Sequence, residues 1–241
     1  MKGTFYGIGV GPGDPELLTV KAIHAIQAAD VLIAPKTEKK EDSLALSIAR
    51  PYLRPDVEIV YQTFPMVRDF AQDTRPWEAN RDEILALLEA GKNVAFLTLG
   101  DPMFFSTYIY IYRLLRDAHV RIETIPGVPA FAAIGSRTGY PIVEGDDILS
   151  IIPATAPEEK IQRALAAADN VVLMKVYKNF SQIVDDLEAA QLSEQAVLVS
   201  RAGLPEERVI RDVPAHRNEK LNYLSTILTR KNPPNKKGAD R

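Results

Sequence analysis

The chain has 241 residues, of which 46% are hydrophobic and 25% are charged, a balance typical of one large or two small globular domains. It has no cysteine, which excludes disulfides, cysteine-ligated metal centres and a thiol nucleophile, and its three histidines lack metal-ligand spacing. The net charge of −3 argues mildly against nucleic-acid binding, and no apolar run approaches the roughly 18 residues of a membrane span, so a cytoplasmic protein is expected.

Strand-like and helix-like segments alternate along the first half, which predicts an α/β fold. The expected strands are Thr4–Val10, Val31–Ala34 (ended by Pro35), Val57–Tyr61, Val94–Leu99 and Arg121–Ile125. One expected helix begins at Pro15 and carries an apolar stripe, and others cover Trp77–Ala90 and Thr107–Arg116.

Pro126, Gly127 and Pro129 then interrupt the pattern and predict a domain boundary. The expected domains are residues 1–125 and 126–230, and the polar tail 231–241 is expected to be disordered. The strands expected in the second domain are Ile148–Ile152, Val171–Met174, Ala196–Ser200, Arg208–Ile210 and Tyr223–Thr229. The helices expected there are Pro157–Ala168 and Phe180–Ala190. The last two strands predict a partly antiparallel sheet.

The stretch GIGVGPG, residues 7–13, places a glycine at every second position after the first strand. A dinucleotide fingerprint needs glycines at i, i+2 and i+5, but its three possible registers end on Pro12, Asp14 and Glu16. A Gly-Lys-Ser/Thr phosphate loop is absent, and Asp14 would repel a phosphate. Two readings stay open: a tight strand-to-helix turn with Asp14 near an N-cap, or a backbone surface against which an organic ligand lies.

A second loop, LTLGDPMFFST, residues 97–107, also follows a buried-type strand and precedes a helix. In open α/β sheets, ligands bind beyond the carboxyl ends of the strands. Two Gly-Asp-Pro loops at equivalent strand ends therefore predict a ligand site at that edge.

Six blocks of the sequence resemble, in order and spacing, those of the tetrapyrrole (corrin/porphyrin) methylase family: VGPGDPELLTVKA, LTLGDPMFFSTY, IPGVPAFAA, VVLMKV, SRAGLPEERV and YLSTILTRK. The resemblance implies two α/β domains with the active-site cleft between them, S-adenosyl-L-methionine as methyl donor (leaving as S-adenosyl-L-homocysteine) and a homodimer. EGDDILSIIPAT, VVLMKV and the Ser-Thr after GDPMFF are most similar to members that methylate C20 of precorrin-2 or cobalt-factor II in cobalamin biosynthesis.

Carried over by position, the resemblance implies a donor site made largely of main-chain contacts. Its residues would be Pro12, Gly100, Asp101, Phe104, Ser106, Thr107, Pro129, Ala130, Met174 and Ala202. The family commonly has a hydroxyl residue where this chain has Pro129-Ala130, and subgroup members often have tyrosine where it has Phe105.

Methyl transfer from a sulfonium is a direct displacement, which positioning alone can accelerate. We therefore name no catalytic residue and predict no metal. The carboxylates of a tetrapyrrole substrate are expected to pair with arginine and lysine, and its flat face with aromatic rings. The residues predicted to contact the substrate are Asp14, Lys36, Phe105, Tyr108, Arg137, Lys175 and Arg201; Lys178 and Tyr110 are further candidates.

Three alternatives stay open. A sibling methylase would act on another carbon, of uroporphyrinogen III or precorrin-4. A relative that modifies RNA or protein would need a basic groove or a peptide site, and the net charge of −3 favours neither. A non-catalytic binding module would be favoured by a broken Gly-Asp-Pro loop, but Gly100-Asp101-Pro102 is intact. No nucleic-acid or membrane partner is expected.

Overall fold

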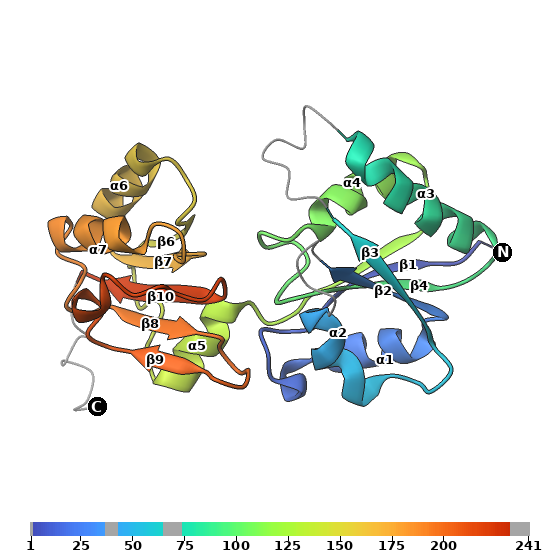
Figure 1. The fold of residues 1–241 in the computed structure, drawn as a ribbon, viewed down its shortest axis with the longest axis horizontal. Coiled ribbons are helices and arrows are strands. Elements are labelled where there is room, and N and C mark those ends of the chain that lie inside the picture. Colours follow the sequence, from blue (N-terminus) through green and yellow to red (C-terminus); the bar gives the residue numbers. More distant parts are fainter. Residues whose placement is uncertain (1, 37–42, 65–73, 232–241) are drawn as a thin grey trace. The chain divides into compact units, whose positions relative to one another are not determined.

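The computed structural model describes residues 2–36, 43–64 and 74–231, and these form two compact units, Met1–Pro129 (unit 1) and Ala130–Arg241 (unit 2) (Figure 1). The predicted domain boundary, between residues 125 and 126, lies slightly earlier in the chain than the boundary between these two units, which falls between Pro129 and Ala130. The tail predicted to be disordered falls, apart from Lys231, outside the described residues. A membrane-spanning helix is not found in the described part of the chain.

Unit 1 contains a five-stranded sheet in the order β3-β2-β4-β1-β5. All neighbouring strands in it are parallel, so their carboxyl ends lie at one edge. The central strands are continuously apolar, as expected where helices cover both faces. The strands are β1 (Phe5–Gly9), β2 (Val31–Lys36), β3 (Glu58–Thr63), β4 (Val94–Thr98) and β5 (Ile122–Ile125).

Helices lie on both faces of this sheet (Figure 1). On one face, α3 (Arg75–Glu89) and α4 (Tyr108–Asp117) bury Trp77, Tyr108 and Ile111 against the sheet. On the other lie α1 (Val20–Ala28) and α2 (Leu44–Ala49). The 3-10 turns are η1 (Pro15–Leu17) and η2 (Arg50–Tyr52).

The second strand continues through Pro35, where the sequence predicted its end. The N–H of Phe64 donates to Lys36 O, so Lys36 faces β3 and Pro35 faces the other side, toward β4. Pairing between β2 and β4 ends at Ile33 and Phe96. The missing N–H of Pro35 therefore removes no ladder hydrogen bond, and the proline is tolerated.

Two helices of unit 1 differ from the sequence prediction. The helix expected from Pro15 is split into η1, whose N-cap is Asp14, and α1, whose N-cap Thr19 accepts the Ala22 N–H at 3.1 Å. Helix α2 was not predicted, because six residues are too few to show an apolar period.

Unit 2 contains a second five-stranded sheet, in the order β6-β7-β10-β8-β9. Strand β10 runs antiparallel to both β7 and β8, and β6 runs parallel to β7. The predicted α/β class and the partly antiparallel second sheet are confirmed. The strands are β6 (Leu149–Pro153), β7 (Asn170–Met174), β8 (Val197–Ser200), β9 (Arg208–Ile210) and β10 (Ser225–Arg230).

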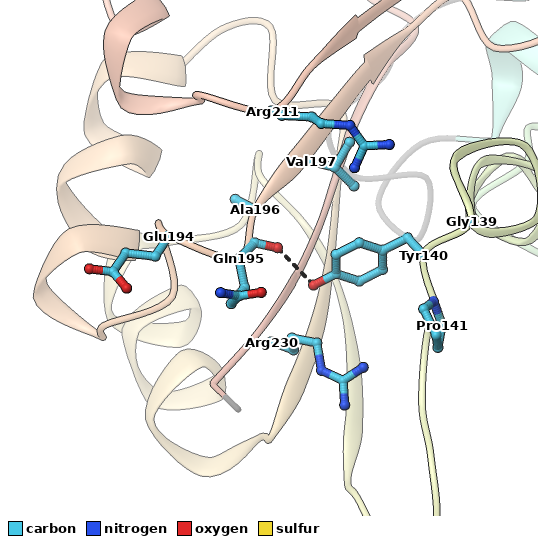
Figure 2. Close-up of a pocket in the computed structure, with 9 residues that line it drawn as sticks. All are labelled: Gly139, Tyr140, Pro141, Glu194, Gln195, Ala196, Val197, Arg211 and Arg230. Atoms are coloured by element: carbon cyan, nitrogen blue, oxygen red, sulfur yellow. Dashed lines mark hydrogen bonds between the residues drawn. The ribbon is translucent and has the colours of Figure 1, made fainter. Parts of the chain in front are cut away.

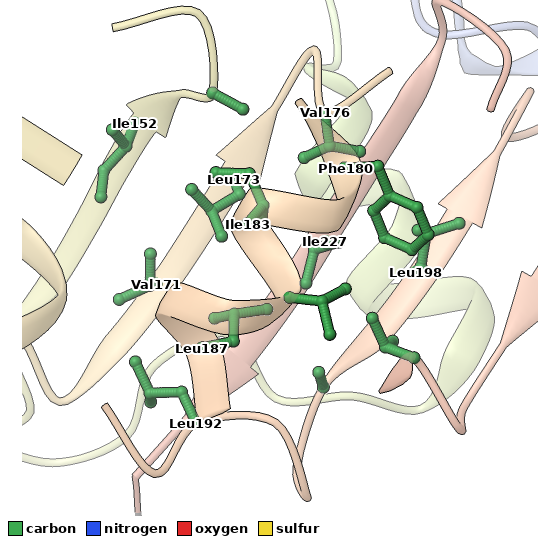
Figure 3. Close-up of a cluster of buried hydrophobic side chains, with 14 of the residues drawn as sticks. Ile152, Val171, Leu173, Val176, Phe180, Ile183, Leu187, Leu192, Leu198 and Ile227 are labelled. Atoms are coloured by element: carbon green, nitrogen blue, oxygen red, sulfur yellow. The ribbon is translucent and has the colours of Figure 1, made fainter. Parts of the chain in front are cut away.

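The sheet of unit 2 is also covered on both faces. Helices α6 (Glu158–Ala167) and α7 (Phe180–Ala189) bury one face, where Leu173, Leu198 and Ile227 pack with Phe180 (Figure 3). Helix α5 (Ala130–Thr138) packs on the other face, and a 3-10 turn, η3 (Pro214–His216), follows β9. The sequence analysis did not predict α5, because the prolines just before it indicated only a domain boundary and not the start of a helix.

Candidate functional site

Three loops of unit 1 meet where β1, β4 and β5 end, and we call residues 9–12, 100–107 and 127–129 together the unit 1 edge. The N–H of Gly100 donates to Gly11 O at 2.8 Å, and the N–H of Gly11 donates to Gly100 O at 3.2 Å. The two Gly-Asp-Pro loops predicted to share one sheet edge are thus bonded to each other through the main chain. Pro12 is buried beside this contact.

The alternating glycines of residues 7–13 have separate packing roles. A Cβ on Gly9 would lie 2.6 Å from both Gly100 O and Gly127 N, and a Cβ on Gly7 would lie 2.1 Å from the ring of Tyr108. Gly11 has a left-handed backbone, with φ +76°. The glycines therefore allow three backbone segments and one tyrosine ring to approach closely.

Asp101 holds the loops of the unit 1 edge together. Its Oδ1 accepts the Met103 N–H at 2.8 Å, and its Oδ2 accepts the Gly127 N–H at 3.0 Å. Both carboxylate oxygens therefore bind backbone amides of the protein. The family resemblance predicts that Asp101 contacts the methyl donor. In the structure, its side chain joins two loops of the unit 1 edge.

The loop after Asp101 displays aromatic side chains. Phe105 has φ +49°, which is rare for a bulky residue, and the residue is 42% exposed. Phe104 packs edge-on against it, with ring centroids 4.9 Å apart. Ser106 Oγ shares a hydrogen bond with Thr98 Oγ1 at 2.7 Å, and Thr107 is the residue before α4. The Ser106 hydroxyl therefore joins this loop to Thr98, the last residue of β4.

Tyr108 lies in the core of unit 1 and not on its surface. Its side chain is fully buried, and its hydroxyl lies 2.6 Å from Thr124 Oγ1. Burial raises the pKa of Tyr108 to about 12. Tyr110 packs edge-on against Trp77 in the same core. Their expected contact with a substrate is therefore not supported by their positions.

The remaining unit 1 residues predicted to contact the substrate lie apart from the core. Lys36, at the end of β2, is half-buried with Nζ 5.8 Å from the ring centroid of Tyr61. Asp14 accepts the Glu16 N–H at 2.9 Å and so caps η1. Asp14 therefore has the capping role that the sequence suggested.

Four predicted residues gather in unit 2, where β7 and β8 end: Met174, Lys175, Arg201 and Ala202, which we call the unit 2 edge. Because both strands are antiparallel to β10, their carboxyl ends lie at one edge of the sheet. Met174 and the buried Ala202 belong to one apolar cluster, together with Phe131 at the start of α5. Ala130 directly precedes Phe131 and is the first residue of α5.

The two basic residues of the unit 2 edge have unusual backbones. Lys175 has φ +61° and Arg201 has φ +57°, although neither is glycine. Burial lowers the pKa of Lys175, and Nε of Arg201 donates to Pro205 O at 2.9 Å. Left-handed backbone at non-glycine residues costs of order 1–3 kcal/mol and clusters at functional sites.

Arg137 forms an ion pair within unit 2. Its Nε lies 2.9 Å from Glu207 Oε2, and its Nη2 donates to Glu207 Oε1 at 3.0 Å. The sequence missed Glu207: it lies in the block SRAGLPEERV, but nothing local distinguishes it from Glu206 beside it. Only the fold shows which of the two acids reaches α5.

A cavity of about 300 Å³ lies in unit 2 near the amino end of β8, away from the unit 2 edge (Figure 2). The Tyr140 hydroxyl donates to Gln195 O at 2.8 Å there, and Arg230 Nη2 donates to Glu144 Oε2 at 2.8 Å. Its lining contains none of the predicted site residues, and we assign it no ligand. Within the described ranges, no three histidine, aspartate or glutamate side chains are grouped as metal ligands.

Comparison with known proteins identifies similar chains. A family model described as Tetrapyrrole (Corrin/Porphyrin) Methylases matches residues 4–215. The Cobalt-precorrin-2 C(20)-methyltransferase of Salmonella typhimurium is 41% identical over 232 residues, which cover 96% of this chain and 98% of the relative. The Precorrin-2 C(20)-methyltransferase of Sinorhizobium sp is 33% identical over 234 residues, which cover 94% of each chain.

The fold also has a solved counterpart. The Uroporphyrin-III C-methyl transferase from Thermus thermophilus, whose structure is complexed with S-adenyl homocysteine, matches with a TM-score of 0.69 at 24% identity. The match covers 94% of this chain and 97% of that chain.

Proposed function

Because the chain belongs to the tetrapyrrole (corrin/porphyrin) methylases, as its sequence predicted, we propose that it transfers a methyl group from S-adenosylmethionine to C20 of precorrin-2 or its cobalt-containing counterpart. The observation that carries the proposal is the similarity, over nearly the full length, to relatives named for that position and substrate. The reaction would be a step of cobalamin biosynthesis.

The unit 1 edge suits the proposed donor. Gly11 and Gly100 carry no side chains, and the nearest atoms to a Cβ built on Gly100, its chain neighbours aside, are backbone atoms of Val128 and Pro129 at 4.0 Å. The carboxylates of Asp14 and Asp101 lie in the same loops and disfavour a phosphate. Glycine loops with acidic neighbours therefore fit a sulfonium cation better than a nucleotide phosphate.

When bound, S-adenosylmethionine supplies an activated methyl group. The chain's own task is then to align the donor with the acceptor carbon and to keep water away. The hydrogen bonds between Gly11 and Gly100, with the Asp101 link to Gly127, hold the unit 1 edge in one geometry before any ligand arrives. We propose that this preorganised edge contacts the donor, with Pro12, Phe104 and Pro129 beside it.

The unit 2 edge supplies the remaining proposed contacts. Met174 and Ala130 are proposed to offer apolar surface for the methyl donor, and Ala202, whose side chain is buried, to contact it through its main chain. Lys175 and Arg201 offer cations for the acetate and propionate groups of a tetrapyrrole, through charge-assisted hydrogen bonds. Their left-handed backbones support this role, because strain of that kind is retained where function requires it.

The proposed substrate contacts are Lys175, Arg201, Lys36, Asp14 and Phe105. Tyr108 is left out because its ring is fully buried. Arg137 is left out because Glu207 already binds two of its nitrogens. Ser106 is proposed to hold its loop through the hydrogen bond to Thr98. Thr107 is proposed to lie beside the methyl donor.

One experiment tests the proposal directly. The protein is incubated with S-adenosylmethionine carrying a ¹³C-methyl group and with precorrin-2 or its cobalt complex in separate reactions, and NMR locates the label. Label at C20 in either reaction supports the proposal, and the faster reaction identifies the substrate. Label at another carbon, or donor binding without turnover of either substrate, would contradict it and favour a sibling methylase or a binding module.

Two further expectations remain proposals: a homodimer and a location in the cytoplasm. Light scattering during size-exclusion chromatography tests the first, since a dimer of the 26.7 kDa chain has twice that mass. A monomer at micromolar concentration would contradict it.

A further inference from the structure

We propose that Arg137 and Glu207 are positioning residues for methyl transfer, because together they hold the loop 201–207 in the conformation that places Arg201 and Ala202. The inference rests on the proposed function, in which Arg201 binds substrate and Ala202 contacts the donor. It assigns to Glu207 a role that neither its sequence context nor the family resemblance suggested.

The loop 201–207 needs an external support. Arg201, Gly203 and Glu206 all have left-handed backbones, with φ of +57°, +73° and +64°. Inside the loop, the Leu204 N–H donates to Arg201 O at 3.0 Å, and the Glu207 N–H donates to Leu204 O at 3.2 Å. Two non-glycine residues in this region persist only where surrounding contacts over-determine them.

Glu207 provides that support from the end of the loop. Its Oε2 accepts the N–H of Gly203 and lies 2.9 Å from Nε of Arg137, and its Oε1 accepts hydrogen bonds from both Nε and Nη2 of Arg137. Burial opposes ionisation, but the Gly203 N–H and the Arg137 guanidinium together lower the pKa of Glu207. The carboxylate is therefore charged at neutral pH and bound from two sides.

Arg137 anchors the carboxylate to the rest of unit 2. It lies in the last turn of α5, and Arg211 Nη2 donates to Thr138 O at 3.0 Å just beyond it. In the middle of α5, Ile134 packs in the apolar cluster that contains Ala202. The ion pair thus ties the loop 201–207 to the helix on which Ala202 rests.

The ion pair with Glu207 also argues against Arg137 as a direct substrate contact. A substrate carboxylate would have to displace Glu207 from a charge-assisted pair in which Oε1 accepts hydrogen bonds from both Nε and Nη2 of Arg137. Displacement would also leave the Gly203 N–H without its acceptor. Arg137 therefore acts through the loop.

The test compares Glu207→Ala, Arg137→Ala and the double variant, using the full-length protein. The measured quantities are the Kd of S-adenosylhomocysteine by calorimetry, and KM and kcat with the tetrapyrrole. We expect Kd and KM to rise about tenfold in each single variant, with kcat changed much less. The double variant should be no worse than Glu207→Ala, because that variant already removes both the ion pair and the acceptor of the Gly203 N–H.

Two conservative variants and one control keep the test decisive. Glu207→Gln keeps an acceptor for the Gly203 N–H and should recover part of the affinity, as should Arg137→Lys. The control is Glu144→Ala. This variant breaks another arginine–glutamate pair of unit 2, between Glu144 and Arg230, whose side chain is 5% exposed. It should leave Kd and KM unchanged. These conservative variants also serve if the alanine variants do not fold.

Unchanged Kd and KM in Glu207→Ala, or equal changes in Glu144→Ala, would overturn the inference. Failure of the wild type to methylate either substrate would instead overturn the proposed function. In that case the Kd for S-adenosylhomocysteine still reports on the role of the ion pair.

Discussion

The backbone N–H of Gly127 donates to Oδ2 of Asp101 at 3.0 Å, and this hydrogen bond joins the loop after β5 to the loop after β4. The other oxygen of Asp101 accepts the Met103 N–H, so the carboxylate is shared between two backbone segments. The proposed donor-binding edge of unit 1 is therefore held largely by main chain, with one acidic side chain as its link.

Replacing Asp101 with alanine should weaken binding of S-adenosylhomocysteine by about tenfold or more. The reason is the loss of hydrogen bonds to a charged acceptor, each of order 1.5–3 kcal/mol, which lets the two loops separate. Calorimetry measures the affinity. The matched control is Asp30→Ala, since Asp30 Oδ2 accepts the Asn93 N–H at 2.8 Å at the opposite edge of the same sheet. Equal effects of the two variants on affinity would contradict the prediction.

Replacing Gly9 with alanine should destabilise unit 1 far more than replacing Gly11. The new Cβ at position 9 meets backbone atoms at 2.6 Å, an overpacking cost above about 3 kcal/mol. At Gly11 the nearest atom is 3.5 Å away, which leaves only a backbone cost of about 1–2 kcal/mol. Urea unfolding followed by tryptophan fluorescence measures both, since Trp77, the sole tryptophan, is fully buried in unit 1. Similar losses would show that the three segments are not tightly packed.

Replacing Tyr108 with phenylalanine should remove an alkaline transition from unit 1. Because burial raises the folded pKa from 10.0 to about 12, the neutral phenol stabilises the fold fully below pH 10, and this contribution is lost as the pH rises to about 12. The wild type should lose about 2–3 kcal/mol over this range beyond what the variant loses. Tryptophan fluorescence in urea at pH 7, 10 and 12 tests it, and parallel curves would refute it.

The same variant tests whether Tyr108 contacts the substrate. At pH 7, Tyr108→Phe should cost about 1 kcal/mol of stability, for the lost bond to Thr124. Its KM for the tetrapyrrole should equal that of the wild type, because the ring is fully buried. A raised KM in steady-state assays would restore Tyr108 to the substrate site.

Replacing Phe105 with glycine should separate stability from substrate binding. Relief of the left-handed strain, about 1–2 kcal/mol, offsets the lost contact with Phe104 and the greater freedom of unfolded glycine. Stability should therefore change by less than about 1 kcal/mol, while KM for the tetrapyrrole rises several-fold. His119→Gly is the control, since His119 has φ +56° and lies in the turn after α4. An unchanged KM in Phe105→Gly would remove Phe105 from the proposed contacts.

Much of the fold was predictable because its signals are local. The apolar runs of β1, β2 and β4 and the periodic stripes of α3, α6 and α7 depend on neighbouring residues only. The signals failed where an element is short, as in α2, or follows prolines, as in α5. Pro35 was misread because its tolerance depends on which neighbouring strand its nitrogen faces.

The candidate site was predictable only in part. The glycine loops and the strand ends that carry Met174 and Ala202 can be placed from motif and order. The partner of each side chain cannot be predicted in this way. Arg137 and Tyr108 both have the chemistry of a substrate contact, but Arg137 binds Glu207, and the ring of Tyr108 packs against the backbone of Gly7.

By itself, the sequence determined the α/β class, the order of the strands and of most helices, and the family, since these follow from periodicity, glycine and proline positions, and motif spacing. Only the tertiary structure decided that Asp101 links two loops and that Arg137 holds Glu207. Asp101 and Gly127 are 26 positions apart in the sequence, and Arg137 and Glu207 are 70 positions apart. The order of the strands in the sheets, and not the order along the chain, brings these residues together.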